Sequence, residues 1–326
     1  MHRIIAGYTC APAGREAELA YYRTLGTTPD ATGVALAWRD DGTPDRIGEL
    51  LDVLPADWAV ALTAIAATYP AWLADHTFGL ASPVPAGRAA ALAAARRIAE
   101  GVRRINDRAG RRAVLAVEFH SAPGYGGPLA GCPQALRASL AELAALDWDG
   151  AAVLLEHCDA AVPGQPPVKG FLTLDQELAV LAELAGSGLG LSLNWGRSLI
   201  ELRDPDRVAE HAARAAASGL LRGYTFSGNG DRANAYGGAW DDTHLPFADP
   251  VDGAYGEPGS LLTTARAEQT LAHLGGLLFL AAKTCWRPDR TDPVERARAA
   301  QANFATVVDL AARTHHPCEP VESPCR

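Results

Sequence analysis

Eight short apolar segments recur along the chain, and between them apolar residues return every three or four positions. Short apolar runs that alternate with helical periodicity are typical of strand–helix units, whose strands form a parallel sheet. The expected strands are residues 3–10, 33–38, 58–64, 113–120, 151–158, 190–195, 223–227 and 277–283. Eight such units in succession predict a (β/α)₈ TIM barrel that forms a single domain.

The length of the chain agrees with one barrel. Its 326 residues exceed the roughly 250 that a barrel typically needs, which leaves room for long loops. A doubly wound open sheet is less favoured, because residues 11–18 after the first strand lack the glycine-rich phosphate turn of that fold. We expect residues 1–314 to form the barrel and residues 315–326 to form a Pro- and Cys-rich tail.

Two connections, residues 68–87 and 228–260, are longer than the usual two to six residues. Both follow strands, so they are expected on the C-terminal rim, where barrel enzymes build their sites. They carry aromatic residues, among them Trp72 in the first and Trp240 in the second. Such rings either stack on the apolar faces of a sugar or pack a small core or subunit contact.

Composition limits the classes of partner that the chain is expected to bind. The net charge of −9 and the pI near 5.5 argue against a nucleic-acid surface, which is normally basic. No run approaches the roughly 18 apolar residues of a membrane span, and the first residues lack a signal core. Six cysteines without CxxC spacing predict reduced thiols in a cytoplasmic protein, although Cys318 and Cys325 could pair.

Polar side chains recur where the expected strands leave the core. Strand alternation places Glu118 and His120 on one side of the fourth strand, and Glu156 follows four apolar residues of the fifth. A glutamate in such a position is costly unless it is paired, ligating or catalytic. Further polar residues at the later strand ends are Asn194, Arg197, Ser227 and Lys283. Their recurrence predicts an active site at the barrel mouth.

The chain contains two lysines, Lys169 and Lys283, among 29 basic residues, so the other 27 are arginines. Both lysines are expected on the C-terminal rim. Lysine can lose its proton when it is desolvated, and can then act as a general base or as a Schiff-base nucleophile. The alternative is that two lysines fell on one rim by chance.

The strand ends resemble those of the xylose-isomerase-like superfamily, which includes sugar isomerases, epimerases, inosose dehydratases and apurinic endonucleases. Leu-Leu-Glu156-His-Cys resembles the fifth strand of these barrels, whose glutamate binds a divalent metal. Leu-Asn194-Trp-Gly-Arg197 stands where the superfamily commonly has Leu-Asp-x-x-His. Phe-His120-Ser-Ala-Pro-Gly is similar to a superfamily segment with a histidine before Pro-Gly, and His244 lies where several members place a histidine.

The chain departs from the superfamily at its metal ligands. Lys283 stands where the eighth strand usually ends in a metal-binding glutamate, and Ser227 stands where a histidine is usual. Lysine and arginine near these positions would repel a divalent ion, so no cofactor is firmly predicted. A shifted site for manganese, magnesium or zinc is the alternative, and its ligands would be His120, Glu156, Asp159 and His244.

These residues predict an enzyme that moves protons on a small polyhydroxylated carbonyl substrate, as an isomerase, an epimerase or a lyase. Glu156 or Glu118 would be the base, His120 an acid or base, and Lys283 the electrophilic stabiliser. The expected substrate-binding residues are Arg197, Asn194, Lys169, Trp195, Trp240 and Trp72.

Two alternatives remain open at this stage. The first is an aldolase or lyase that forms a Schiff base at Lys283. The second is a catalytically degenerate barrel that binds a sugar or a protein partner. The expected partner is a small sugar-like molecule; nucleic acid and membrane are not expected partners, and a homo-oligomer is possible.

Overall fold

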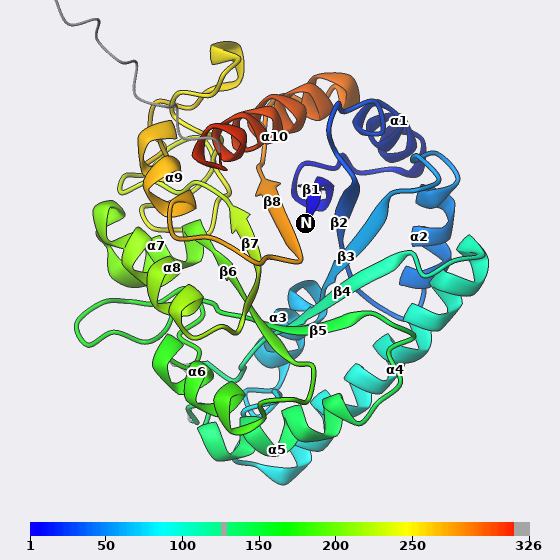
Figure 1. Cartoon of the computed structure of the whole chain (residues 1–326), viewed down its shortest axis with the longest axis vertical. Helices are drawn as coiled ribbons and strands as arrows, with labels where there is room; N and C mark the ends of the chain where they lie inside the picture. The colour runs from blue at the N-terminus through cyan, green and yellow to red at the C-terminus, as the bar shows by residue number, and fades with distance from the viewer. Residues whose placement is uncertain (125–128, 316–326) are drawn as a thin grey trace, which may run out of the picture.

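Eight parallel strands close into a barrel in the order in which they follow one another along the chain (Figure 1). The computed structural model describes residues 1–124 and 129–315. Its strands are β1 His2–Ala6, β2 Gly33–Ala37, β3 Ala59–Thr63, β4 Val114–Phe119, β5 Ala152–Glu156, β6 Gly190–Asn194, β7 Leu221–Phe226 and β8 Phe279–Lys283. Closure comes from β1 and β8, which pair with Ile4 opposite Ala281. The (β/α)₈ fold expected from the sequence is confirmed.

Helices surround the barrel as an outer ring (Figure 1). The helices of the described residues are α1 Arg15–Leu25, α2 Thr43–Leu51, α3 Ile65–Ala74, α4 Pro85–Ala109, α5 Pro133–Ala144, α6 Leu174–Glu183, α7 Trp195–Leu202, α8 Val208–Ala217, α9 Thr264–Leu271 and α10 Pro293–His315. In this view α3 overlaps β4 and β5 and does not belong to the outer ring. Short 3₁₀ helices occupy Gly7–Thr9, Pro205–Arg207 and Gly253–Tyr255. The expected tail falls outside the described residues from position 316 onward.

Most strands end earlier than the sequence indicated. The first strand stops at Ala6 and passes into the 3₁₀ helix Gly7–Thr9, while the sixth stops at Asn194 because this residue caps α7. The expected loop 68–87 also contains most of α3 and the start of α4. Pro70 lies inside α3, and a proline within a helical pattern normally indicates that the helix stops or kinks there.

Small and aliphatic side chains fill the barrel interior. The inner cluster consists of Ile4, Ala6, Ala35, Ala61, Ala116, Leu154, Phe279 and Ala281. Phe279 occupies the space beside Gly223, where an added Cβ would lie 2.5 Å from the ring. Successive inward positions on a strand are two residues apart. The next inward residues toward the C-terminal end are therefore polar: Glu118 after Ala116, Glu156 after Leu154, and Lys283 after Ala281.

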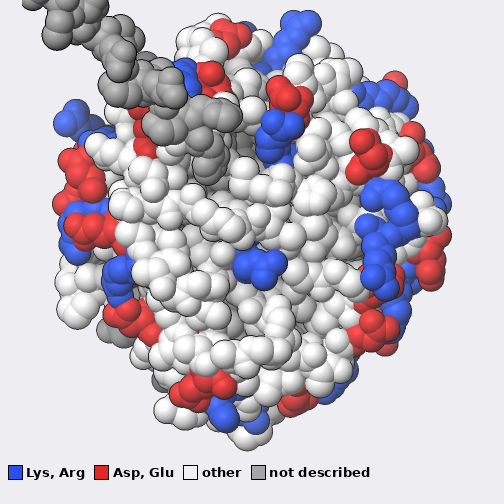
Figure 2. Space-filling model, in the orientation of Figure 1, with Lys and Arg blue, Asp and Glu red and all other residues white. Residues whose placement is uncertain are grey.

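The outer surface carries charges of both signs. Arg104 of α4 pairs with Asp45 of α2, and Arg96 of α4 pairs with Glu142 of α5. On the face shown in Figure 2, charged side chains of both signs gather toward the periphery and the centre is largely uncharged. None of the described helices is long and apolar enough to cross a membrane.

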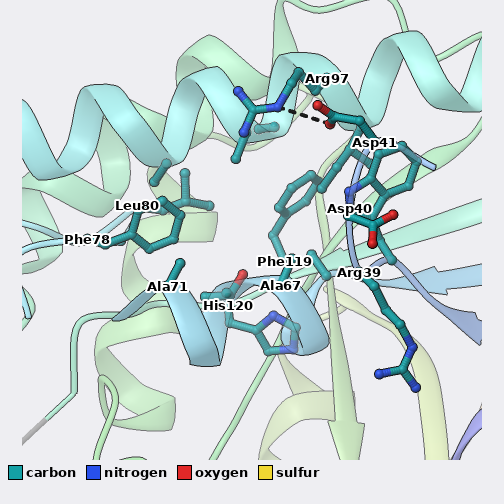
Figure 3. Close-up of a pocket in the computed structure, with 18 residues that line it drawn as sticks. Arg39, Asp40, Asp41, Ala67, Ala71, Phe78, Leu80, Arg97, Phe119 and His120 are labelled. Carbon is teal, nitrogen blue, oxygen red and sulfur yellow. Dashed lines mark ion pairs between the residues drawn. The ribbon is translucent and has the colours of Figure 1, made fainter. Parts of the chain in front are cut away.

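A cavity of about 310 Å³ lies between α3, α4 and the loop after β2 (Figure 3). Apolar side chains form most of its wall, and His120 belongs to its lining. It is distinct from the barrel interior, and the side chain of His120 has no surface exposed to it.

Candidate active site

Three charged or ionisable side chains from different strands meet in the barrel mouth. Glu118 of β4, Glu156 of β5 and Lys283 of β8 are all buried, and each lies one inward position beyond the apolar interior. Tyr8, from the 3₁₀ helix Gly7–Thr9, presents its ring to Lys283 with the ammonium nitrogen 5.1 Å from the ring centroid. In the described part of the chain, no hydrogen bond or ion pair engages this nitrogen. The ammonium is therefore available to a ligand.

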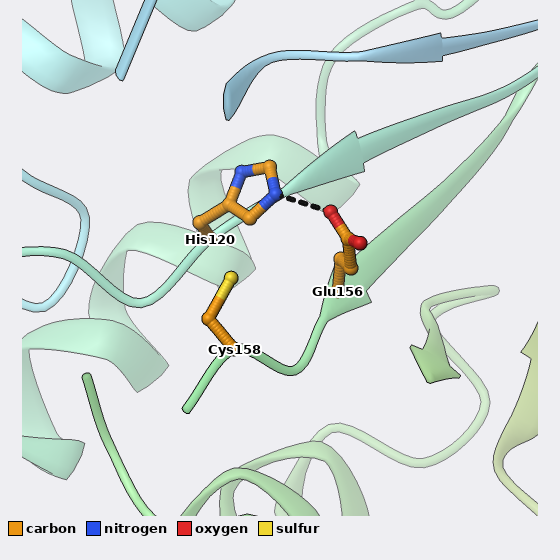
Figure 4. A group of neighbouring side chains, drawn as sticks. All are labelled: His120, Glu156 and Cys158. Atoms are coloured by element: carbon orange, nitrogen blue, oxygen red, sulfur yellow. Dashed lines mark hydrogen bonds and ion pairs between the residues drawn. The ribbon is translucent and has the colours of Figure 1, made fainter. Parts of the chain in front are cut away.

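His120 and Glu156 form a tight buried pair across β4 and β5. The imidazole Nε2 lies 2.6 Å from Glu156 Oε2, and the two residues are 1% and 4% exposed (Figure 4). Burial raises the pKa of Glu156, but the hydrogen bond and the charge of His120, together with the charges of Lys283 and Arg197, outweigh it and bring the pKa down to about 2. Burial lowers the pKa of His120 and outweighs the effect of Glu156. The pair is therefore a carboxylate and a neutral imidazole.

This protonation state fixes the tautomer of His120. An ionised Glu156 can only accept a hydrogen bond, so Nε2 carries the proton and donates it. The other nitrogen, Nδ1, then bears a lone pair, and it is buried with no hydrogen-bond partner among the described residues. An imidazole oriented by a carboxylate and free at its second nitrogen is the arrangement of a general base.

Glu118 has the opposite protonation preference. Burial and the nearby charge of Glu156 raise the pKa of Glu118 to about 8. Two carboxyl groups in one low-dielectric site cannot both ionise easily. The proton therefore stays on Glu118, whose charged form is stabilised less by neighbouring donors and cations than that of Glu156. At neutral pH the mouth therefore combines a proton donor, Glu118, with the His120–Glu156 base.

A second charged group closes the side of the mouth, and its centre is Asp242. Arg197 Nη2 and Lys169 Nζ lie 2.8 and 3.1 Å from Asp242 Oδ2, and His244 Nδ1 lies 3.4 Å from Oδ1. Asp242 belongs to the long loop after β7, whereas Lys169 and Arg197 follow β5 and β6. Sequence reasoning missed Asp242, although His244, two residues later, was an expected ligand.

Arg197 retains unused donors. It lies in the first turn of α7, where Asn194 Oδ1 caps the helix by accepting the amide hydrogen of Gly196. Arg197 Nε and Nη1 and Asn194 Nδ2 are buried without a partner in the described residues. Buried donors are normally satisfied. These three groups can therefore bind oxygens of a ligand or water.

The three tryptophans that were expected to bind substrate lie in different parts of the structure. Trp72 packs near Cys158 and Phe171 on the β4–β5 side, with its ring 6.0 Å from that of Phe171. Trp240 stacks under Arg203 at 4.9 Å. Trp195 is fully buried in the outer core rather than in the mouth, because α7 begins at this residue and carries it away from the barrel axis.

Sequence reasoning also missed a buried hydrogen-bond network behind β5. His157 Nδ1 lies 2.7 Å from Glu177 of α6, and Nε2 lies 2.9 Å from Glu201 of α7. Burial disfavours the charged imidazole, but the two glutamates outweigh it and raise the pKa of His157 to about 10. Ser121 donates to the other oxygen of Glu177. This network ties the residues next to His120 and Glu156 to two outer helices.

The Glu177→Gln variant is expected to lose about 3 kcal/mol of unfolding free energy, because it leaves His157 with one glutamate partner instead of two. Chemical denaturation at pH 7 measures the change. The matched control is Glu183→Gln on the same helix, where the partner, Arg137, is exposed and the loss should stay below about 1 kcal/mol. Equal stability of the two variants would contradict the assigned role of the network.

In the described residues, two groups of side chains each bring three possible ligand atoms close enough together to hold one metal ion. They are His120, Glu156 and Cys158 in the mouth, and His157, Glu201 and His211 behind β5. The expected ligands Asp159 and His244 belong to neither group. Asp159 accepts amide hydrogens of residues 168–170, and His244 Nδ1 lies 2.9 Å from the Ser227 hydroxyl.

The donor set in the mouth does not fit the divalent ion that the superfamily resemblance implies. Glu156 is its one carboxylate, and Lys283 and Arg197 already lower the pKa of this group. Burial raises the pKa of the Cys158 thiol well above its usual value, whereas zinc binds the thiolate. Manganese and magnesium prefer several oxygen ligands.

Elemental analysis of untagged protein is expected to give equal, substoichiometric manganese, magnesium and zinc in the wild type and in Glu156→Gln. The reason is that the positive charge of Lys283, rather than a metal ion, offsets the negative charge of the Glu156 carboxylate. Stoichiometric metal in the wild type that disappears in the variant would restore a metal site at Glu156.

Comparison with known proteins places the chain in a family. Residues 4–299 match the family described as "Domain of unknown function (DUF4862)". An uncharacterized protein, STM3670, of Salmonella typhimurium strain LT2 is 35% identical over 251 residues, which cover 75% of this chain and 78% of that protein.

Solved structures share the fold. A structure of L-ribulose 3-epimerase has a TM-score of 0.61 at 15% identity and covers 100% of both chains. The 3-keto-D-glucoside 4-epimerase YcjR from E. coli has a TM-score of 0.56 at 14% identity and covers 96% of this chain and 100% of its own. These likenesses agree with the (β/α)₈ barrel fold expected from the sequence. On its sequence match, the chain belongs to the DUF4862 family.

Proposed function

We propose that the protein is an isomerase or epimerase that moves a proton on a small polyhydroxylated carbonyl compound. The observation that carries this proposal is the meeting of three groups in one buried mouth: a protonated Glu118, the His120–Glu156 base, and Lys283, whose ammonium has no partner among residues 1–124 and 129–315. Convergent groups with opposite protonation preferences are typical of acid–base catalysis. The names of the solved structures with the same fold, which are sugar epimerases, agree with it.

The base removes the acidic proton of the substrate. His120 Nδ1 takes a proton from the carbon next to the carbonyl, and the electrons of that C–H bond move onto the carbonyl oxygen. Glu156 stabilises the resulting imidazolium through Nε2, and the Lys283 ammonium stabilises the negative oxygen. For epimerisation, Glu118 gives its proton to the opposite face of the same carbon, and exchange with solvent then returns the proton to Glu118 and removes the one on His120. For isomerisation, the hydroxyl proton moves to the former carbonyl oxygen, and His120 returns its proton to the neighbouring carbon.

Arg197 and Asn194 orient the substrate through the donors that have no partner in the described part of the chain. A polyol presents several hydroxyl oxygens that match such donors. Asp242 holds Arg197 and Lys169 in place, so it fixes the position of the donors without contacting the reacting carbon. Burial of all these groups strengthens their interactions with the substrate.

The experiment that tests the proposal is deuterium incorporation. Wild-type protein in D₂O is incubated with L-ribulose, D-fructose and methyl 3-keto-β-D-glucoside, and proton NMR follows the signal of the carbon-bound hydrogen beside the carbonyl. Loss of that signal with at least one compound, absent in His120→Gln and retained in the exposed variant Glu183→Gln, would support the proposal. No incorporation with any compound would contradict it.

A Schiff base at Lys283 is the second candidate, because the amine has no partner in the described residues. In this reaction the nitrogen of Lys283 attacks the substrate carbonyl and water leaves. Borohydride would reduce the imine and fix the adduct to Lys283, where peptide mass spectrometry detects it. Deuterium incorporation without a trapped adduct would favour the first candidate.

The proton transfer should depend on pH through Glu118. Because the pKa of Glu118 is raised to about 8, its acid form persists at neutral pH and disappears as the pH rises through that value. We expect kcat/KM for deuterium exchange to fall above about pH 8. In Glu118→Gln the rate should be lower at pH 7, and this alkaline decline should be missing; an unchanged decline would assign it to another group.

A further inference from the structure

The second group of possible metal ligands lies behind β5, outside the barrel mouth. His157 directly follows β5, Glu201 lies in the last turn of α7, and His211 lies in α8. Each offers one ligand atom, and these three atoms lie within 4.8 Å of one another. Three separate segments of the chain therefore bring two imidazoles and a carboxylate together, and zinc binds both kinds of group in proteins.

The spacing of these side chains suits a zinc ion. One oxygen of Glu201 faces each imidazole: His157 Nε2 lies 2.9 Å from Oε2, and His211 Nε2 lies 3.8 Å from Oε1. Two atoms bound to one tetrahedral zinc ion at about 2.0–2.1 Å are about 3.3 Å apart. The two observed distances lie on either side of this value, so small movements of the side chains are enough to hold an ion.

Two of the three possible ligands are held in place from behind. His157 Nδ1 is hydrogen-bonded to Glu177 at 2.7 Å, and Ser121 donates to the other oxygen of Glu177. Glu201 Oε2 accepts the amide hydrogen of Ala160. A zinc-binding histidine typically donates from its second nitrogen to a carboxylate or carbonyl, which orients the ring toward the ion. His157 has this arrangement, with Nε2 directed at Glu201.

His211 has the fewest partners of the three. Its side chain is 4% exposed, and Nε2 lies too far from Glu201 for a hydrogen bond. Nδ1 is buried and has no hydrogen-bond partner among residues 1–124 and 129–315. Buried polar groups are normally paired. This imidazole is therefore suited to a ligand that the protein itself does not supply.

The charge of the network also favours a cation. The carboxylates of Glu177 and Glu201 both contact His157, so an imidazolium at this position balances one of the two negative charges. A zinc ion that replaces the Nε2 proton balances both, and the proton passes to water. Because this proton competes with the ion, we expect the site to fill when zinc is supplied. This agrees with the low zinc content expected of protein purified without added metal.

We propose that His157, Glu201 and His211 bind a zinc ion that links the end of β5 to α7 and α8. Three protein ligands leave the fourth position of a tetrahedral ion to water. Glu201, the most exposed of the three at 10%, gives the ion its access from solvent. The site does not depend on the proposed reaction, because none of its ligands belongs to the barrel mouth.

Calorimetric titration with zinc tests the proposal. All proteins in this experiment carry Cys318→Ser and Cys325→Ser, because these two cysteines of the tail are other possible zinc ligands. The parent chain should bind one zinc ion, and His211→Gln should bind it at least tenfold more weakly. The matched control is His273→Gln, which changes an exposed histidine after α9 and should bind zinc as the parent does.

Glu201→Gln repeats the test from α7, in case His211→Gln does not fold. Glutamine keeps an oxygen that can accept from His157 and from the amide of Ala160, but it removes the negative charge. The same tenfold loss is expected. Zinc should also raise the Tm of the parent chain and leave the Tm of both variants unchanged, because a ligand stabilises only the protein that binds it. Circular dichroism verifies the fold.

The outcomes that would overturn the proposal are distinct. Absence of zinc binding to the parent chain is the first, and undiminished binding by the folded variants His211→Gln and Glu201→Gln is the second. Loss of binding in Glu156→Gln would place the ion in the barrel mouth and would also overturn the site behind β5. Zinc binding by Glu156→Gln that equals the parent's would support it.

Discussion

Glu156→Gln is expected to slow deuterium exchange roughly 10³- to 10⁴-fold without unfolding the protein. A carboxylate can only accept the hydrogen bond from Nε2–H of His120. An amide can also donate through its NH₂ group, which favours the tautomer with the proton on Nδ1. The amide cannot stabilise the imidazolium by charge either. Single-turnover exchange rates with the best compound of the panel measure the effect, and circular dichroism verifies the fold.

The control for Glu156→Gln is a glutamate that makes an exposed ion pair. Glu183→Gln removes the same charge from the outer face of α6 and should exchange at the wild-type rate. If Glu156→Gln retains more than about a tenth of the wild-type rate, the His120–Glu156 pair is not the base.

Lys283→Met is expected to reduce kcat roughly 10²- to 10³-fold and to leave KM nearly unchanged. Methionine keeps much of the side-chain length and apolar contact with Tyr8 but removes the ammonium that stabilises the developing oxygen anion. The loss should therefore fall on the transition state rather than on the bound substrate.

Lys169→Met is the matched control for Lys283→Met. Lys169 is equally buried, but its ammonium is paired with Asp242 and lies over the Tyr69 ring at 5.3 Å. Its loss should loosen Arg197 and raise KM more than it lowers kcat. If both variants change KM alone, Lys283 binds substrate and does not stabilise the reaction.

The sequence predicted the inner layer of the mouth because strand geometry is regular. Side chains alternate across a strand, so Glu118, Glu156 and Lys283 could be assigned to the barrel interior once the strands were recognised. His120 was expected on the same side as Glu118, and it does lie against Glu156. For residues on strands, the sequence therefore predicts both the position and the neighbouring residues.

Residues carried by loops and helix starts were not predictable in the same way. Asp242 reaches Lys169 and Arg197 only through the path of a long loop, and no periodicity describes that path. Trp195 directly follows a strand, yet the immediate start of α7 turns it into the outer core. The His157 network depends on which helices pack behind β5, and that packing follows from tertiary contacts rather than from local pattern.

The pairing of β1 with β8 has a consequence for how the chain matures during synthesis. Residues 2–6 are synthesised before their partners 279–283, which follow more than two hundred positions later. Until then, the hydrogen-bonding edges of β1 and of the most recently added strand stay open to other chains. Lys283 ends the closing strand, so the last step that seals the barrel also brings this side chain to the mouth. A nascent chain therefore lacks the complete mouth for as long as these strand edges are open.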